Sequence, residues 1–390
     1  MRLRHSTLFG SVLGLGFSFL GMQPARASMN GPESIKIDGG PVGSLQFSGG
    51  FDGYGYAMNN TATENKSSGV QLGNALIELQ KPVGLLQFTV EIGAYSAYVM
   101  GYAPGSSTAA GQNYFLESPL YAGYVTLAPS SHFSVSAGQL NSLEGYEGAQ
   151  DWNNYNVLAS ELFYVENDQN RGVELSANAG KFTATVSISD GYFTKVINYL
   201  QYLLTYAPDK NDSFNLFGGA NLGTTGPDVT GTGNLLYDNS TLFGGYYTYT
   251  NGGFTMTPEV QYQRTRPMNK YAAGGFQIGG PVSNIGLALF SDYQFGPRSP
   301  WSIGAFGEYA SESYRKGATY AGITPDYFGF GPGSRLYGFS VTPTWQYKDL
   351  FARADLGFIH VNPGAGGSAF GTNGFQKNQV TGVLEAGLLF

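Results

Sequence analysis

The stretch FTATVSISD, residues 182–190, is the clearest indication of the fold. Its residues alternate between apolar Phe182, Ala184, Val186 and Ile188 and polar Thr183, Thr185, Ser187 and Ser189. This period of two predicts a β-strand with one apolar face and one polar face. The polar face carries hydroxyl groups instead of the Lys and Glu that cover a soluble sheet, which suits a wall between lipid and water.

The same alternation predicts sixteen strands. They lie near residues 45–56, 70–80, 85–97, 119–128, 132–141, 171–179, 182–190, 196–207, 213–222, 240–250, 253–264, 284–296, 301–313, 336–346, 350–361 and 378–390. Every second connection is short and rich in turn residues, such as Asn251-Gly252, whereas most of the others are long. We therefore expect an all-β fold, a transmembrane antiparallel up-and-down β-barrel with short periplasmic turns, long extracellular loops and both termini in the periplasm. The alternatives are barrels of fourteen or eighteen strands, because Ala273–Ile278 fits either a strand or a loop.

The composition excludes several other classes of protein. Only 12% of the 390 residues are charged, about half of the usual share. The hydrophobic share of 42%, with 28 Tyr, 27 Phe and 3 Trp, argues against a disordered chain. After residue 27 no apolar run reaches the ~20 residues of a membrane-crossing helix. A net charge of -7 argues against binding of nucleic acid, and the lack of Cys excludes a disulfide scaffold.

The first 27 residues resemble an export signal. Arg2 and Arg4 precede an apolar core from Leu8 to Leu20, and Ala25-Arg26-Ala27 matches a cleavage site. The alternative of a single-pass anchor requires a longer apolar run. We expect a cleaved signal peptide at 1–27, a short periplasmic segment at 28–43 and the barrel at 44–390.

The last strand has a distinctive apolar face. That face consists of Val380, Gly382, Leu384, Ala386, Leu388 and Phe390. It resembles the C-terminal strand by which the barrel assembly machinery of the outer membrane recognises its clients. Leu388 and Phe390 are thus predicted to form an assembly signal, against the alternative that a buried strand simply ends here.

A family resemblance rests on residues 75–84 (ALIELQKPVG), which lead into residues 85–93, and on residues 137–140 (AGQL). The chain resembles Gram-negative general porins and is most similar to the putative β-barrel porin-2 (OmpL-like) family. The resemblance implies passive diffusion of small hydrophilic solutes or ions through a bacterial outer membrane. It also implies lipid and lipopolysaccharide as partners, no cofactor, and a homotrimer as one expectation.

Strand parity predicts which charged side chains line the pore. The acids are Glu78, Glu91, Glu174, Glu259, Asp292, Glu308, Asp355 and Glu385, and the base is Arg353. A lumen with this excess of carboxylates concentrates cations. The alternative is that Arg171, Arg264, Arg266 and Arg335, at the strand ends, fold inward and pair with the acids.

The longest loop, at about 141–170, is acidic. No Lys or Arg occurs between Lys81 and Arg171. We predict that the loop folds into the barrel, that residues 156–164 include a helical turn, and that Glu144, Glu147, Asp151 and Glu161 lie nearest the constriction. An external loop that binds divalent ions is the alternative.

Other expectations concern aromatic residues and catalysis. Aromatic pairs near strand ends, at Tyr54 and Tyr56, Tyr95 and Tyr98, and Tyr246 and Tyr247, are expected in the interfacial girdles of the barrel. Beyond residue 27 the histidines are His132 and His360, and neither lies in a pattern that indicates a hydrolase or a metal site. A non-conducting structural or adhesive barrel is the main alternative function, and a barrel hydrolase is a distant third.

Overall fold

A computed structural model describes residue 29 and residues 33–62, 65–105, 119–225, 235–266, 281–313 and 326–390. The predicted signal peptide at 1–27 and the ambiguous stretch 273–278 lie outside these ranges. The N-terminal segment forms β1 (Ile35–Asp38) and the short 3-10 helix η1 (Gly40–Val42), and β1 pairs with the start of the first barrel strand.

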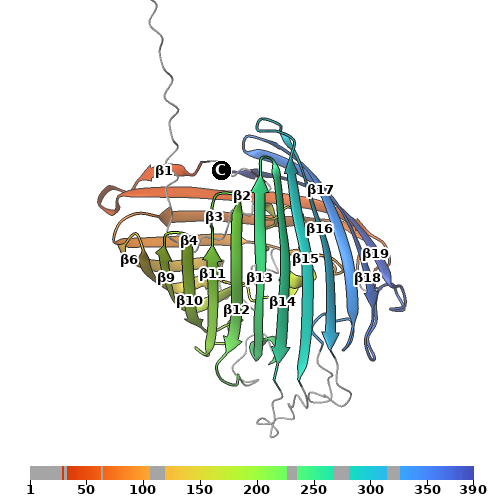
Figure 1. The fold of residues 1–390 in the computed structure, drawn as a ribbon. Helices are drawn as coiled ribbons and strands as arrows, with labels where there is room; N and C mark the ends of the chain where they lie inside the picture. The colour runs from red at the N-terminus through yellow and green to blue at the C-terminus, as the bar shows by residue number, and fades with distance from the viewer. Residues whose placement is uncertain are drawn as a thin grey trace, which may run out of the picture.

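The barrel wall is a closed ring of sixteen antiparallel strands, as predicted (Figure 1). They are β2 (Ser44–Met58), β3 (Ser68–Lys81), β4 (Leu86–Ala94), β6 (Leu120–Ser130), β7 (Phe133–Asn141), β9 (Gln169–Ala179), β10 (Phe182–Ser189), β11 (Tyr199–Tyr206), β12 (Asp212–Asn221), β13 (Ser240–Asn251), β14 (Phe254–Thr265), β15 (Val282–Gln294), β16 (Trp301–Ser313), β17 (Arg335–Tyr347), β18 (Leu350–Asn362) and β19 (Asn378–Leu389). The ring closes where β19 pairs with β2, with Leu388 opposite Phe51 and Leu384 opposite Gly55. Closure leaves no sheet edge with unpaired backbone groups, which a sheet in lipid requires.

Each predicted strand corresponds to one observed strand, with differences of a few residues at the ends. The largest, three residues at one end, occur at the predicted strand 196–207, which begins at Tyr199 in β11, and at the predicted strand 85–97, which ends at Ala94 in β4. The chain then continues to β5 (Tyr98–Val99), which pairs in parallel with β8 (Leu158–Ala159) inside the barrel. The remaining elements within the described residues are the 3-10 helix η2 (Asp151–Asn153) and the helices α2 (Glu161–Tyr164) and α3 (Leu235–Asp238). Within the described ranges, no helix has the length and hydropathy needed to cross a membrane.

Short and long connections lie at opposite ends of the barrel. Figure 1 shows the C-terminus and the hairpin between β13 and β14 at one end, here called the turn end. Gly252 occupies that hairpin with a φ of +62°, a conformation that glycine adopts without strain. The long connections leave the opposite end, here called the loop end.

The wall is apolar outside and polar inside. In β10, Phe182 is 60% exposed, whereas Thr185 and Ser187 are each 3% exposed. The last strand follows the same rule, since Leu384 faces outward and Glu385 is buried. This inverts the pattern of a soluble sheet and matches a barrel whose outer belt contacts hydrocarbon.

The interior also contains a hydrophobic core. Tyr146, in the connection between β7 and β9, packs against Tyr246 of β13 and Phe290 of β15, with ring centroids 5.4 and 5.1 Å apart. Leu158 and Leu162 from the same connection belong to this buried cluster. Part of the lumen is therefore filled by protein.

Candidate functional site

The connection between β7 and β9, residues 142–168, runs through the barrel interior and is called the inner loop below. The Asn156 amide donates to the hydroxyls of Ser340 and Thr342 in β17, at 3.0 and 2.8 Å. The Gln261 amide in β14 donates to the carbonyl of Leu162 at 2.9 Å. Strands β14 and β17 lie across the ring from β7, so the loop spans the interior.

Two inward-facing carboxylates of the wall hold the backbone of the inner loop. Asp355 in β18 accepts hydrogen bonds from the backbone N–H groups of Val157 and Leu158, at 2.9 and 3.0 Å. Glu308 in β16 accepts one from the N–H of Glu161 at 2.8 Å. These bonds satisfy backbone donors that would otherwise be buried without a partner. Asp355 and Glu308, predicted to line the pore, thus contact the loop.

A buried charge cluster holds another part of the loop. The Arg353 guanidinium in β18 pairs with Glu385 in β19 and with Asp151 in η2, where its Nη2 lies 3.2 Å from the Asp151 carboxylate. Asn74 donates to Asp52 and to Asp151, at 2.9 and 3.0 Å. Carboxylate oxygens of Asp52, Asp151 and Glu385 lie within 4.8 Å of one another, a spacing that can hold a metal ion. Here Arg353 supplies the positive charge.

The other three acids of the predicted constriction are hydrogen-bonded within the interior. Glu144 accepts from the Tyr199 hydroxyl at 2.6 Å and from the Asn167 N–H at 3.0 Å. Glu147 accepts from the N–H and the hydroxyl of Ser160. Glu161 accepts from the Tyr102 hydroxyl at 3.1 Å. Burial raises the pKa of Glu144 and of Glu161 above the ordinary range of a carboxyl.

The helical turn expected within residues 156–164 is confined to α2. Ser160 precedes the helix, and its hydroxyl accepts a bond from the Phe163 N–H, as a residue in the N-cap position does. Residues before Ser160 are extended, because Leu158 and Ala159 form β8 and pair with β5. The short helix brings Leu162 onto the hydrophobic core and leaves Tyr164 40% exposed.

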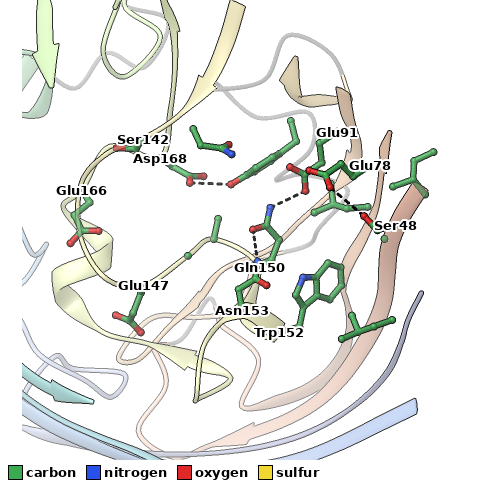
Figure 2. A pocket seen from close by; sticks show the side chains of 18 of the residues that line it. Ser48, Glu78, Glu91, Ser142, Glu147, Gln150, Trp152, Asn153, Glu166 and Asp168 are labelled. Atoms are coloured by element: carbon green, nitrogen blue, oxygen red, sulfur yellow. Dashed lines mark hydrogen bonds between the residues drawn. The ribbon is translucent and has the colours of Figure 1, made fainter. Parts of the chain in front are cut away.

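A cavity of about 420 Å³ lies between the inner loop and strands β2, β3 and β4; we call it the acidic chamber (Figure 2). Six carboxylates line it: Glu78, Glu91, Glu144, Glu147, Glu166 and Asp168. None of its described lining residues is Lys, Arg or His. In Figure 2, Glu78 and Glu91 approach from the wall, and Glu147, Glu166 and Asp168 approach from the loop. The arrangement gathers six carboxylates around one cavity.

Hydrogen bonds also reach the chamber acids on the wall and Asp168. Glu78 accepts from the Ser48 hydroxyl at 3.2 Å, and Glu91 accepts from the Gln150 amide at 3.3 Å. Asp168 accepts from the Tyr121 hydroxyl at 3.1 Å. Burial raises the pKa of Asp168 to about 6, although hydrogen bonds from tyrosine hydroxyls act in the opposite direction.

A second cavity, of about 470 Å³, lies nearer the loop end and is called the aromatic chamber. Five tyrosines line it: Tyr95, Tyr102, Tyr164, Tyr192 and Tyr237. Glu166, Asn167 and Asp168 line both chambers, so this short segment separates them. The two cavities are therefore adjacent at this segment.

The aromatic chamber was not predicted, and several aromatic residues expected in the girdles lie in the interior. Tyr54, Tyr56, Tyr95, Tyr98 and Tyr246 are each at most 8% exposed and pack in the interior, not in a girdle at the membrane surface. Aromatic residues near strand ends look alike in the sequence whether their rings face lipid or lumen. Tyr102, Tyr192 and Tyr237 lie in connections and not in strands, and this placement was the sequence signal that could have indicated the aromatic chamber.

Of the remaining sequence-predicted residues, Phe390 lines the acidic chamber, and Glu174, Glu259, Asp292, Leu388, His132 and His360 lie outside both chambers. Glu174, Glu259 and Asp292 are buried on wall strands β9, β14 and β15. Leu388 is 39% exposed, and the backbone N–H of Phe390 donates to Gly49 at 3.0 Å. The rings of His132 and His360 each bond to an asparagine side chain, at 2.9 and 2.6 Å.

Comparisons with known proteins agree with this architecture. A model of the family described as "Putative beta-barrel porin-2, OmpL-like" matches residues 44–390. No curated protein matches the chain significantly.

Solved structures share the fold at low sequence identity. An anion-selective porin from Comamonas acidovorans is 12% identical with a TM-score of 0.56, and the match covers 89% of this chain and 99% of that one. OmpF of Salmonella typhi, solved with daunomycin, is 12% identical with a TM-score of 0.55, over 91% and 100% of the two chains. The trimer form of OmpT, an outer membrane protein of Vibrio cholerae, is 9% identical with a TM-score of 0.53, over 89% and 99%. At such identities the likeness concerns the fold alone.

Proposed function

The chain belongs to the putative β-barrel porin-2, OmpL-like family, and on that premise we propose that it forms a water-filled, cation-preferring diffusion channel in an outer membrane. The acidic chamber is the observation that carries the cation preference. Its six carboxylates surround one cavity without a described base among the lining residues. A passage of this charge raises the local concentration of cations and repels anions.

In this proposal the inner loop narrows the channel. Six acids line the passage and face the permeating solute: Glu144, Glu147, Glu166 and Asp168 on the loop, and Glu78 and Glu91 on the wall. Asp151 and Glu161 have a different role, because their partners Arg353, Tyr102 and Glu308 hold the loop in position. The four predicted constriction acids thus divide into two that line the passage and two that support it.

The selectivity of similar folds does not transfer to this chain. One structural neighbour is described as anion-selective, but it shares only 12% of its residues with this protein. Selectivity depends on the side chains that line the passage and not on the strand topology.

The proposal includes a cellular setting. We propose a signal peptide at residues 1–27, both termini in the periplasm, and Leu388 and Phe390 as an assembly signal read by the barrel assembly machinery. A homotrimer within lipid and lipopolysaccharide is supported by the trimer form of one structural neighbour. We propose no enzymatic activity, because the rings of His132 and His360 bond to asparagines and not to a nucleophile or an acid.

The test is the reversal potential of the refolded protein in a planar lipid bilayer with a gradient of potassium chloride. A cation-preferring channel gives a reversal potential with the sign of the equilibrium potential of potassium. A potential of the sign set by chloride contradicts the proposal.

A non-conducting structural barrel is the second candidate, and the hydrophobic core inside the barrel favours it. Tyr146, Leu158 and Leu162 fill part of the lumen together with wall residues. The same bilayer experiment separates the two functions. A structural barrel inserts without discrete conductance steps, whereas a narrowed channel gives small but resolved steps.

A further inference from the structure

We propose that the outer wall at the loop end binds a phosphorylated glycolipid of the lipopolysaccharide kind through a row of basic and hydroxyl side chains, here called the basic rim. The inference rests on the proposed outer-membrane setting and gives one of its lipids a site. The rim consists of Arg264 on β14, Ser283 on β15, Ser311 and Ser313 on β16, and Arg335 on β17, four neighbouring strands of the wall (Figure 1). The strand register places Arg264 opposite Ser283, Ser283 opposite Ser313, and Ser311 opposite Arg335.

Both arginines of the rim face away from the lumen. Each is exposed, whereas the next residue of its strand is buried inside the barrel. Thr265 bonds there to the carbonyl of Leu236, and Leu336 belongs to the hydrophobic core. Within the described residues, neither guanidinium takes part in an ion pair. Arg264 and Arg335 therefore do not pair with the pore acids, which was the alternative that the sequence left open.

No acid on the described outer wall beside the rim offsets this charge. Every Asp and Glu of strands β14 to β18 is buried on the inward face: Glu259, Asp292, Glu308, Glu312 and Asp355. Glu312 accepts from the backbone N–H of Tyr327 at 3.1 Å, inside the barrel. The connections 267–280 and 314–325, which follow β14 and β16 in the chain, contain no Asp or Glu in their sequence. Fixed cations without a counter-charge at a lipid surface attract anionic headgroups.

The outward side chains beyond the rim follow the layers of a lipid. On β17, Arg335 is followed by Tyr337, which stacks on His360 with ring centroids 4.9 Å apart, and then by the exposed Phe339 and Val341. Strand β14 repeats this order, with a tyrosine and an exposed valine beyond its arginine. A cation for a phosphate, an aromatic ring at the interface and apolar side chains for acyl chains suit an amphiphile and not a soluble anion.

The spacing of the rim favours a headgroup with two phosphates. Three strand spacings of about 4.8 Å separate β14 from β17, so the backbones that carry the two arginines are about 14 Å apart. A phospholipid with one phosphate occupies one guanidinium, whereas a disaccharide with a phosphate at each end occupies both. Between the arginines, the hydroxyls of Ser283 and Ser313 lie 2.8 Å apart and offer donors and acceptors to sugar hydroxyls. The rim therefore fits a phosphorylated disaccharide better than a phospholipid headgroup.

The turn end of the barrel has a different charge pattern. Its exposed turns carry both signs, since Lys210 follows Asp209 in one turn and Asp349 follows Lys348 in another. Such turns neutralise themselves, whereas the described part of the basic rim does not. The two ends of the barrel thus suit leaflets with different headgroups. With both termini in the periplasm, as proposed, the basic rim lies in the outer leaflet.

The test uses the full chain refolded in detergent micelles, with fluorescently labelled rough lipopolysaccharide as the probe. Thermophoresis should show saturable binding. Binding should be at least about tenfold weaker for the same lipopolysaccharide after removal of its phosphates, and for phosphatidylglycerol, whose headgroup carries one phosphate. Equal binding of the dephosphorylated form would overturn the inference, because the rim would not recognise phosphate. Equal binding of phosphatidylglycerol would overturn it too, because the rim would then be a general surface for anionic lipid.

Arg264→Gln with Arg335→Gln is the decisive variant, because both side chains are exposed and hold no other element in place. It should weaken binding of lipopolysaccharide about tenfold to thirtyfold, the loss of two arginine contacts at a lipid surface. Lys210→Gln with Arg298→Gln is the matched control, since it removes the same charge from exposed positions at the turn end and should bind like the parent. The heat-induced shift of the band on denaturing gels verifies folding. Unchanged binding in the folded rim variant, or an equal loss in the control, would contradict the inference.

Reversal potentials in potassium chloride, measured on the same preparations, keep this inference separate from the proposed channel. The rim variant should retain the cation preference of the parent, because its two arginines lie outside both chambers. Cation preference without binding of lipopolysaccharide refutes only the lipid site. Binding of lipopolysaccharide by a protein that does not conduct refutes only the channel.

Discussion

The two sides of the inner loop use the same kind of residue for different purposes. On the packed side, Asp355 and Glu308 bond to the loop backbone, and Arg353 pairs with Asp151. On the open side, Glu78 and Glu91 face the loop across the acidic chamber. Asp355, Glu308, Glu78 and Glu91 all belong to the inward face of a wall strand, so strand parity alone does not separate them.

The wall acids of the two sides differ in the kind of donor: Asp355 and Glu308 accept from the backbone of the inner loop, whereas Glu78 and Glu91 accept from side chains. Asp355 accepts from two backbone N–H groups and from the hydroxyls of Ser340 and Thr342. Glu78 accepts one side-chain bond, from Ser48. A carboxylate that accepts from the loop backbone acts as a structural anchor, whereas one that accepts from side chains at a cavity wall can attract a passing ion.

Removing the buried base on the packed side should have the largest effect. Arg353→Met leaves Asp151 and Glu385 buried without their partner, which costs about 3–5 kcal/mol. The midpoint of urea unfolding in lipid vesicles should fall accordingly. Adding Asp151→Asn and Glu385→Gln should recover part of the loss, because the unpaired charges disappear; an unchanged midpoint in the single variant would refute the anchoring role.

Removing a wall anchor should release the loop locally. Asp355→Ala leaves the N–H groups of Val157 and Leu158 without acceptors, at about 1–3 kcal/mol each. We expect faster proteolysis within residues 142–168 and a larger single-channel conductance. Asp292→Ala is the matched control, because Asp292 is buried on β15 and lies in neither chamber. Equal proteolysis of both variants would show that Asp355 does not hold the loop.

The strands could be predicted from the sequence, because side chains alternate across a strand with a period of two. Residues 182–190 show the pattern, and β10 (Phe182–Ser189) follows it closely. The inside-out orientation was also predictable, since hydroxyls and amides occupy the polar face. The strands and their orientation depend on contacts between residues that are close in sequence or that face each other in a hairpin.

The path of the inner loop could not be predicted in the same way. Its contacts join residues far apart in sequence, 147 positions for Glu161 with Glu308 and 202 for Asp151 with Arg353. Sequence composition indicated an acidic loop but not which wall acids it would bond. Tyr95 and Tyr98 show the same limit, because a ring near a strand end fits lipid or lumen equally well.

Neutralising the open side should change selectivity and leave stability nearly intact. Glu78→Gln with Glu91→Gln removes two charges from the acidic chamber, and a loss of about 1 kcal/mol of cation stabilisation corresponds to about a fivefold lower cation-to-anion permeability ratio. Glu308→Gln is the control on the packed side: its carbonyl oxygen can still accept the Glu161 N–H. An equal loss of selectivity in Glu308→Gln would contradict the prediction that the open-side acids determine selectivity and the packed-side acids do not.

The smallest expected effect is a pH dependence centred on Asp168, which lies where the two chambers meet. Burial raises its pKa to about 6, so the carboxylate is charged above pH 7 and largely neutral below pH 5. Its surroundings are the Tyr95 and Tyr121 hydroxyls, Gln169 and the carboxylate of Glu91. The cation-to-anion permeability ratio should therefore fall, by about twofold, as the pH is lowered from 7 to 5.

Asp168→Asn separates this titration from that of the other chamber acids. The variant should have, at pH 7, the lower ratio that the parent reaches at pH 5, and its ratio should change little between those values. Reversal potentials at each pH provide the measurement. A pH step that persists in Asp168→Asn would assign the titration to another carboxylate of the open side, with Glu91 as the neighbour to substitute next. The packed side should give no such step, because each of its carboxylates is committed to the inner loop or to Arg353.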